Sequence, residues 1–329
     1  MKAIGGYFEL ADRERGIFPH SDGILLNTGR TALEYILRNI PEIKGIWIPY
    51  YTCEVVLEPI KKLNIPYFFY HINFNFEIAE NFELEDGQYI IVNNYFGIKD
   101  AYIKTLYQSY GNRLIVDCAQ AFFAEPISNT MSFYSCRKFV GVADGGVAYG
   151  VSDNLYSSYA VDDSSDHNSH LMIRRNHGAE AGFHYYQMNE RKLDNQPIRR
   201  MSNETKDILN HIDYKRIISS RRNNFEYLHK ALCDLNMLKI PSFDSFVCPM
   251  VYPFYSEDID LKKHLIQNKI FVATYWSNVL EWCKSNDLES ELTTHIVPLP
   301  IDQRYGIEDL DRIIRLISDY NEENSNNWC

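Results

Sequence analysis

The sequence of 329 residues is long enough for one large α/β domain and a smaller one, and its 45% hydrophobic and 23% charged residues are ordinary values for a folded globular protein. The formal net charge of −11 argues against nucleic acid as the main partner, because binding to a phosphate backbone needs a basic surface. No apolar run approaches the roughly 18 residues of a membrane span and no signal peptide is recognisable, so we expect a cytoplasmic protein without membrane contact.

The seven cysteines form no Cys-x-x-Cys pair, and their odd number does not suit a framework of disulfide bonds. This pattern favours reduced thiols in a cytosolic protein and predicts no metal site.

The first part of the sequence predicts repeating strand–helix units. Residues 24–26 form a short apolar strand, residues 27–31 a glycine-containing turn, and residues 32–38 have helical periodicity. The pattern continues with strands at 45–49, 66–71, 89–92 and 113–117 and helices at 54–63 and 98–110. Short apolar runs that alternate with helices favour a mostly parallel sheet covered on both faces.

The second part is less regular. Residues 151–204 are polar and predict a lid or an interface arm, and a long helix, in one or two pieces, is expected over 203–235. Strands and helices then alternate at 251–255, 261–268, 270–274, 294–299 and 307–320. We therefore predict a large domain over residues 1–225, whose N-terminal segment could pack on the small domain, and a small α/β domain over 226–329.

Four segments end where a predicted strand meets a loop, which is where ligands bind in open α/β sheets. In the first, the backbone N–H groups at a helix start, a hydroxyl and a glycine at Gly29, Arg30 and Thr31 suit a phosphate. An ordinary helix cap at Thr31 explains the same residues equally well.

The other three segments also have two interpretations each, and for Lys138 the second is an ordinary surface lysine. Tyr51 and Cys53 follow the second strand and could stack on a ring, or belong to the aromatic core. Asp117 ends an apolar strand and could hold a pyridine nitrogen protonated, or cap a helix. Lys138 follows small polar residues and precedes Gly145 and the glycine after it, which suits a lysine that forms an imine and needs room for a planar cofactor.

Six segments, in this order, resemble the DegT/DnrJ/EryC1/StrS family: TGRTAL, IPYYTCEVV, NNYFG, VDCAQA, SFYSCRKFVGVADGG and VPLPIDQRY. The members are fold-type-I aminotransferases and relatives that act on sugars and use pyridoxal 5'-phosphate (PLP). The resemblance covers roughly residues 20–320. It implies the PLP-dependent transferase (aspartate aminotransferase-like) fold, with a large mostly parallel-sheet domain and a smaller C-terminal α/β domain.

The resemblance also implies roles for single residues. Lys138 would form the internal aldimine and later move the proton, Asp117 would pair with the pyridinium nitrogen, and Gln120 would contact the phenolic oxygen side of the ring. Tyr51 or Cys53 would lie against the ring.

For the cofactor phosphate, the resemblance implies a cradle formed by Gly29, Arg30 and Thr31. Either Ser135 or Ser132 would add a hydrogen bond.

Three positions depart from the family pattern. Many members have the lysine five residues after a serine, and counting from Ser132 leads to Arg137, whereas the Ser-x-x-Lys spacing from Ser135 leads to Lys138. Arginine stays protonated and forms no useful imine, so the chemistry selects Lys138. An arginine placed against the cofactor would instead indicate a degenerate relative.

The other departures concern the substrate. A histidine common in the family is Asn94 here, and the asparagine that a partner subunit supplies before a Tyr-Arg-Met is Ile198. Asn94 and Arg304 are candidate substrate contacts, with a surface ion pair as the alternative role of Arg304.

The implied function is transfer of an amino group from an amino-acid donor, glutamate by resemblance, to a keto-sugar, expected to be nucleotide-linked and used in polysaccharide biosynthesis. The enzyme would be a homodimer with a shared active site. The alternative is a non-catalytic, sugar-binding or regulatory member of the same fold. A dehydrating relative normally has histidine in place of the lysine, which this sequence lacks.

Overall fold

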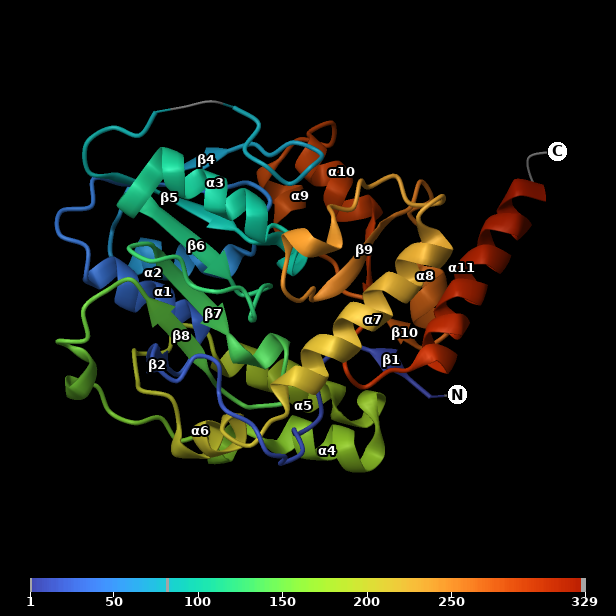
Figure 1. The fold of residues 1–329 in the computed structure, drawn as a ribbon, viewed down its shortest axis with the longest axis horizontal. Helices are drawn as coiled ribbons and strands as arrows, with labels where there is room; N and C mark the ends of the chain where they lie inside the picture. Colours follow the sequence, from blue (N-terminus) through green and yellow to red (C-terminus); the bar gives the residue numbers. More distant parts are fainter. Residues whose placement is uncertain (1, 81–82, 327–329) are drawn as a thin grey trace.

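The computed structural model describes residues 2–80 and 83–326. Its centre is a seven-stranded sheet in the order β2-β8-β7-β6-β5-β3-β4 (Figure 1). All strand pairs are parallel except the two that β8 makes with β2 and β7, so β8 alone runs against the others. The strands are β2 (Ile24–Leu26), β3 (Gly45–Pro49), β4 (Tyr67–Tyr70), β5 (Gln88–Asn93), β6 (Leu114–Cys118), β7 (Met131–Ser135) and β8 (Gly146–Tyr149). The predicted strand–helix units and the mostly parallel sheet are confirmed.

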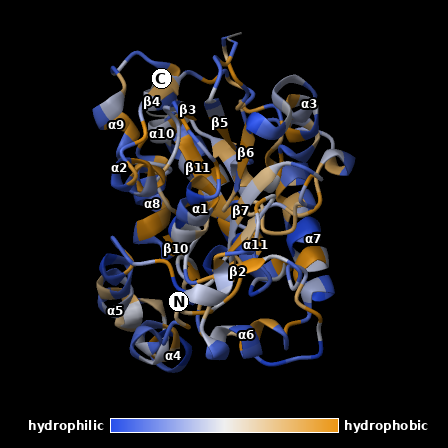
Figure 2. Ribbon diagram, turned by 90° about the vertical axis from the view of Figure 1, so that its left-hand side faces the viewer, coloured by the Kyte–Doolittle hydropathy of each residue, from blue (hydrophilic) through white to orange (hydrophobic). Residues whose placement is uncertain are grey.

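Side chains alternate between the two faces of each central strand, because successive residues of a strand point to opposite sides. Ile91, Ile115 and Phe133 pack on the face covered by α1 (Gly29–Arg38) and α2 (Leu57–Lys62). Val116 and Tyr134 belong to the core on the opposite face, where α3 (Asp100–Tyr110) lies. Figure 2 shows the apolar strands enclosed between helices with polar outer surfaces. Coverage of both faces explains why these strands read as continuous apolar runs.

The region expected to be a lid or arm contains two helices, α4 (Ser169–His177) and α5 (Ala179–Lys192), which pack side by side (Figure 1). Gly178, at φ +88°, separates them. The long helix expected over 203–235 consists of α6 (Asn203–Leu209) and α7 (Tyr214–Leu232). The predicted domain boundary at 225–226 falls inside α7 and stays a prediction.

The C-terminal part holds two short sheets. In one, β9 (Val251–Tyr255) pairs antiparallel with β11 (Ile296–Pro300), and in the other β1 (Ile4–Gly5) pairs parallel with β10 (Ile270–Phe271). The strand expected over 270–274 is therefore only two residues long. The helices here are α8 (Leu261–Gln267), α9 (Val279–Trp282), α10 (Leu288–His295) and α11 (Ile307–Asn326).

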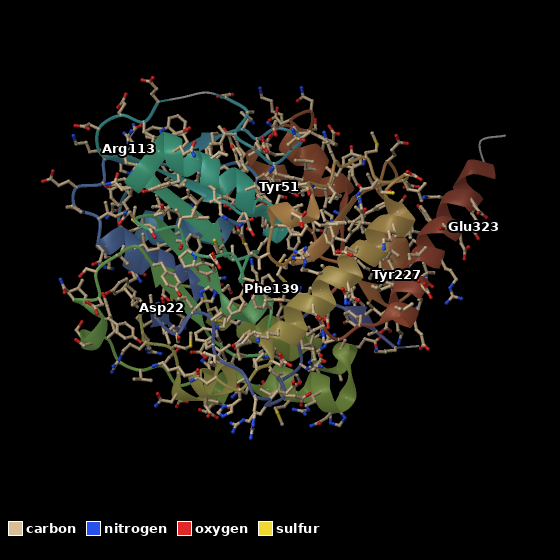
Figure 3. The ribbon with its side chains drawn as sticks, viewed as in Figure 1. Asp22, Tyr51, Arg113, Phe139, Tyr227 and Glu323 are labelled. Carbon is tan, nitrogen blue, oxygen red and sulfur yellow. The ribbon has the colours of Figure 1, made fainter. Side chains whose placement is uncertain are left out.

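Short 3₁₀ turns join several of these elements. They lie at Glu54–Val56, Tyr95–Gly97, Gly111–Arg113, Cys136–Lys138, Tyr156–Ser158, Ser165–His167 and Phe243–Ser245. After the turn that follows β7, Phe139 lies at the junction with α7, near the centre of Figure 3, and the guanidinium of Arg221 lies 4.6 Å from its ring centroid. Within residues 2–80 and 83–326, no helix has both the length and the apolarity to cross a membrane.

Candidate active site

A cavity of about 160 Å³ lies at the carboxyl ends of the central strands. The start of α1, the ends of β5, β6 and β7, the end of α5 and Trp276 from the C-terminal part all contribute to its wall. Of the residues that the sequence predicted, the cavity brings together Gly29, Arg30, Cys53, Asn94, Asp117, Gln120, Ser135 and Lys138. It does not include Thr31, Tyr51, Ser132 or Arg304.

Lys138 and Asp117 are the chemically distinctive pair of this cavity. Lys138 ends the 3₁₀ turn after β7, and Asp117 belongs to the neighbouring strand β6. Burial raises the pKa of Asp117, while the charge of Lys138 and a hydrogen bond of 2.8 Å from the backbone N–H of Ala119 act against this rise. In the described part of the chain, Lys138 takes part in no hydrogen bond or ion pair. The cavity thus holds a desolvated acid and an amine without a partner.

The alternative role of Asp117, an N-cap of a following helix, does not fit the fold. No helix begins after β6, because residues 119–124 form turns. From the described residues the carboxylate accepts only the Ala119 N–H, which closes the first of these turns. Its other oxygen is left for a partner in the cavity.

The start of α1 offers backbone donors to the same cavity. Thr28 is the N-cap, and its hydroxyl accepts the N–H of Thr31 at 3.0 Å, while the Thr31 hydroxyl accepts the N–H of Thr28 at 3.0 Å. Thr31 is therefore the third helical residue of a capping box, so it takes part in capping as the sequence also allowed, but the cap itself is Thr28, and Thr31 does not line the cavity. No acceptor within residues 2–80 and 83–326 pairs with the N–H groups of Gly29 and Arg30. Free N–H groups at a helix start are an anion-binding arrangement.

Glycine at position 146 brings β8 close to this helix start. A Cβ atom there would lie 2.1 Å from the carbonyl oxygen of Thr28 and 2.8 Å from the N–H nitrogen of Gly29. These distances are too short for any other residue. The second glycine of the Gly-Gly segment is thus explained by the approach of β8 to the start of α1.

Ser132 and Tyr51 lie outside the cavity for reasons of local geometry. Ser132 and Ser135 are three apart on β7, so they point to opposite faces of the sheet, and only Ser135 reaches the cavity. Ser132 faces a smaller cavity of about 40 Å³ beside α3. Tyr51 (Figure 3) is fully buried against Tyr95 and Trp276, at ring centroid distances of 5.6 and 5.2 Å. Its alternative role as a core aromatic matches this position.

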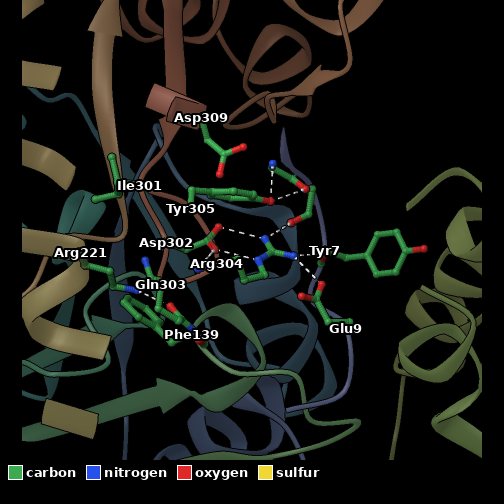
Figure 4. A network of polar contacts seen from close by, with 12 residues as sticks. Tyr7, Glu9, Phe139, Arg221, Ile301, Asp302, Gln303, Arg304, Tyr305 and Asp309 are labelled. Carbon is green, nitrogen blue, oxygen red and sulfur yellow. Dashed lines mark hydrogen bonds and ion pairs between the residues drawn. The ribbon is translucent and has the colours of Figure 1, made fainter. Parts of the chain in front are cut away.

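Arg304 belongs to a buried ion-pair network rather than to the cavity (Figure 4). Its guanidinium contacts the carboxylates of Asp302 at 2.7 Å and Glu9 at 3.0 Å and donates to the backbone oxygen of Tyr7 at 3.0 Å. The alternative of an ion pair was therefore closer to the structure than a substrate contact, although the pair is buried and not on the surface. The network ties the N-terminal segment to the loop after β11.

Removing this guanidinium should destabilise the fold and leave the cavity unaffected. Arg304→Ala is expected to lower the free energy of unfolding by about 3–5 kcal/mol, because it leaves the buried Asp302 carboxylate without its cation. Burial alone would raise the pKa of Asp302, but Arg304 holds it below its ordinary value, so the stabilisation is present above about pH 4 and is lost as the pH falls through the folded pKa. Urea denaturation of both proteins measures the difference.

The matched control for this prediction is Lys2→Ala. Lys2 forms an ion pair with Asp309 at 3.0 Å, and its side chain is 64% exposed, so its loss should change the free energy of unfolding by no more than about 1 kcal/mol. Weaker ligand binding by Arg304→Ala without loss of stability would instead indicate a role in binding.

The cavity also contains Asn93, Glu190 and Trp276, which the sequence did not indicate, and Arg137, the alternative that the count from Ser132 gave. Asn93 ends β5 next to Asp117 of β6, so the rule that ligands bind at strand ends could have identified it. Glu190 and Trp276 come from α5 and from the C-terminal part, and no local pattern in the sequence connects them with the strand ends.

Three buried polar atoms of cavity residues have no hydrogen-bond partner in the described chain: Arg137 Nε and, on two amide side chains, Gln120 Nε2 and Asn93 Oδ1. Gln120 uses its other atom, Oε1, to accept the N–H of Phe96 at 2.9 Å, and Asn93 donates to the Thr52 hydroxyl at 2.9 Å. A buried polar atom without a partner costs about 1–3 kcal/mol, so the two amide atoms indicate a bound group that accepts beside Gln120 and donates beside Asn93.

No family model and no curated protein matches this sequence. Among solved structures, the chain is similar to the putative sugar aminotransferase Spr1654 from Streptococcus pneumoniae in its PMP form, at 14% identity and a TM-score of 0.66, over 97% of this chain and 92% of that one. DesV from S. venezuelae has 13% identity and a TM-score of 0.64, over 91% and 84%. A DegT DnrJ EryC1 StrS aminotransferase from Brucella abortus has 16% identity and a TM-score of 0.59, over 90% and 85%. The chain therefore has the α/β fold of these sugar aminotransferases, as the sequence predicted.

Proposed function

We propose that this chain is a PLP-dependent aminotransferase that moves an amino group from an amino acid, glutamate by resemblance, to a carbonyl acceptor such as a nucleotide-linked keto-sugar. The observation that carries the proposal is that one cavity contains both a lysine without a hydrogen-bond partner among the described residues, Lys138, and a desolvated acid, Asp117. The fold of solved sugar aminotransferases supports it, and one of these, Spr1654, has been solved in both PLP and PMP forms.

The residues of the cavity fit the parts of PLP. Its phosphate would be held by the N–H groups of Gly29 and Arg30 and by the Ser135 hydroxyl. The guanidinium of Arg30 is already ion-paired with Asp194 at 2.7 Å, so the backbone of the helix start is the better phosphate ligand. Asp117 would face the ring nitrogen, and the unpartnered Nε2 of Gln120 would donate to the phenolic oxygen.

When bound, the cofactor supplies an electron sink for the reacting amino acid. The remaining work belongs to the chain. Lys138 would hold the cofactor covalently and then accept and return the proton at the Cα atom of the substrate, a role that contributes about 10²–10⁴ in rate. Trp276 and Leu193 give the cavity apolar walls that restrict water.

The rival function is that of a non-catalytic, sugar-binding or regulatory relative. The state of Asn94 favours it, because both ends of this side chain are already used: its Nδ2 donates to Asp100 at 2.6 Å and its Oδ1 accepts the N–H of Lys99 at 3.0 Å. A substrate contact by Asn94 would have to replace one of these bonds. Lys138 and Asp117 argue for catalysis, because a desolvated acid and an unpaired amine in one cavity are typical of catalytic sites.

Titration of the purified chain with PLP tests the proposal. We expect a new visible absorbance band that saturates at one cofactor per chain, and its loss when labelled glutamate is added, as the amino group is transferred. Pyridoxal without phosphate is the matched control and should bind much more weakly. A protein that ignores PLP would exclude the proposal, and a protein that binds PLP but takes no label from any amino acid would support the non-catalytic alternative.

The site of a related enzyme is often completed by a second subunit, so we further propose a cytoplasmic homodimer with a shared site. Sedimentation of the purified chain, with and without PLP, measures its assembly.

A further inference from the structure

Three cationic side chains line the cavity: Arg30, Arg137 and Lys138. They differ in whether a carboxylate forms an ion pair with them. Arg137 forms an ion pair with Glu190, and Arg30 forms one with Asp194 at 2.7 Å. Lys138 has no ion-pair partner within the described ranges 2–80 and 83–326. A carboxylate in α5 and one just beyond its end therefore pair with the two arginines, Arg30 also having Glu58 at 3.7 Å, whereas no described carboxylate forms an ion pair with the lysine.

The contrast matters most for Arg137 and Lys138, because they are neighbours in the same 3₁₀ turn. Successive residues of such a turn point about 120° apart, so both side chains cannot face the same partner. The Arg137 guanidinium lies against α5, where its side chain is only 17% exposed and its Nε has no hydrogen-bond partner. The charge of Lys138, in contrast, acts on Asp117 and Cys53.

Glu190 is charged at this position. Burial raises its pKa, but the ion pair and hydrogen bond with Arg137, together with the nearby Arg30, outweigh burial and hold the pKa below its ordinary value. His170, which also lies close to Arg137, stays neutral, since burial and the charge of Arg137 lower its pKa to about 4. Among the described residues, Glu190 is therefore the only carboxylate that forms an ion pair with Arg137, and the charge of Asp144 adds a smaller stabilisation of the guanidinium.

We propose that Glu190 is a positioning residue that selects which of the two neighbouring cations faces Asp117. By holding the guanidinium of Arg137 against α5, it reserves the Asp117 side of the cavity for the amine of Lys138. This inference rests on the proposed function. It also gives a physical reason for choosing between the two residues that the sequence allowed, since counting from Ser132 leads to Arg137 and counting from Ser135 leads to Lys138.

Without Glu190, Arg137 would be a buried cation that has lost its ion-pair partner, which is a costly state. Asp117 is the other carboxylate in the wall of the cavity, and a guanidinium binds a carboxylate with two parallel hydrogen bonds. Arg137 would then form an ion pair with the Asp117 carboxylate. This carboxylate would no longer be available to the cofactor ring or to Lys138.

The test uses Glu190→Gln in the full chain, which keeps the shape of the side chain and removes its charge. The readout is the amount of PLP attached to Lys138 after borohydride reduction, determined by peptide mass, together with the dissociation constant of PLP. We expect the attached fraction to fall and the dissociation constant to rise by about tenfold or more, in the range of coupled neighbouring residues. Adding Arg137→Gln to this variant should restore both values to near wild type.

The matched control is Asp194→Asn, which removes the nearer of the two carboxylates of Arg30 and leaves Glu58 at 3.7 Å. The Asp194 side chain is 54% exposed, and Arg30 lies at the phosphate end, so attachment at Lys138 should not decrease. Circular dichroism and thermal unfolding verify that every variant is folded.

The outcomes separate this inference from the proposed function. A wild-type chain that binds no PLP overturns the proposed function. A wild type that binds PLP, with Glu190→Gln equal to it, overturns the positioning role alone. Loss in Glu190→Gln that Arg137→Gln does not restore also overturns it, because Glu190 would then act only by supporting the fold.

Discussion

Lys138→Ala is expected to abolish covalent attachment of PLP completely. No other lysine lines the cavity, so borohydride treatment of the variant should leave no cofactor on the chain, while wild type yields one labelled peptide that contains residue 138. Turnover should fall by about 10²–10⁴ or more, because the variant also loses the base that moves the substrate proton. Mass spectrometry of the reduced, digested protein measures the attachment.

Lys138→Arg is the companion variant. It keeps the positive charge beside Asp117 but cannot form an imine, so it should bind PLP without attaching it. Lys104→Ala, an exposed lysine of α3, should behave like wild type. Attachment that persists on another lysine in Lys138→Ala would contradict the assignment of the residue, and an unlabelled wild type would contradict the chemistry.

Asp117→Asn should keep PLP bound and slow the reaction by about 10²–10³, because the amide cannot hold the ring nitrogen in its protonated form as a carboxylate does. The measurement is a single-turnover rate with glutamate, at a PLP concentration that saturates the variant. Equal rates in variant and wild type would mean that the carboxylate serves only the turn that it closes with the N–H of Ala119.

The same variant should be more stable than wild type when no cofactor is present. Burial raises the pKa of Asp117 above the value of about 3.9 expected for the unfolded chain, so the folded protein holds this proton more tightly than the unfolded one. The free energy of unfolding therefore decreases as the pH rises above about 4, and Asn, which does not titrate, avoids this loss. The free energy of unfolding of Asp117→Asn should therefore exceed that of wild type by more at pH 7 than at pH 4. The same difference at both pH values would argue that Asp117 is not desolvated.

Much of the fold could be predicted because the apolar runs of the central strands and the periodicity of α1 are local properties of the sequence. The strand ends were equally accessible: Asp117, Gln120 and Lys138 do meet in one cavity. Helices α4 and α5 were missed as helices because their residues are mostly polar and exposed, which leaves little periodicity to read.

Errors at the site came from orientation and distance. Whether Ser132 or Ser135 reaches the cavity depends on the face of β7 to which each side chain points, and this is fixed only when the sheet is assembled. Arg304 has the residue type of a substrate ligand, but its partner Glu9 lies almost 300 positions away, and no spacing rule connects the two. Glu190 and Trp276 are distant in the sequence for the same reason.

The pairing of β1 with β10 has a consequence for how the chain is made. Ile4 is synthesised long before its strand partner Ile270, so β1 must wait until the segment that contains Ile270 has left the ribosome. At about 5–20 residues per second this delay is on the order of 10–50 s. During that time β1 has no partner strand, and the central sheet can fold first. Closure of this last contact would then fasten Glu9 and Tyr7 onto segments that already have their shape.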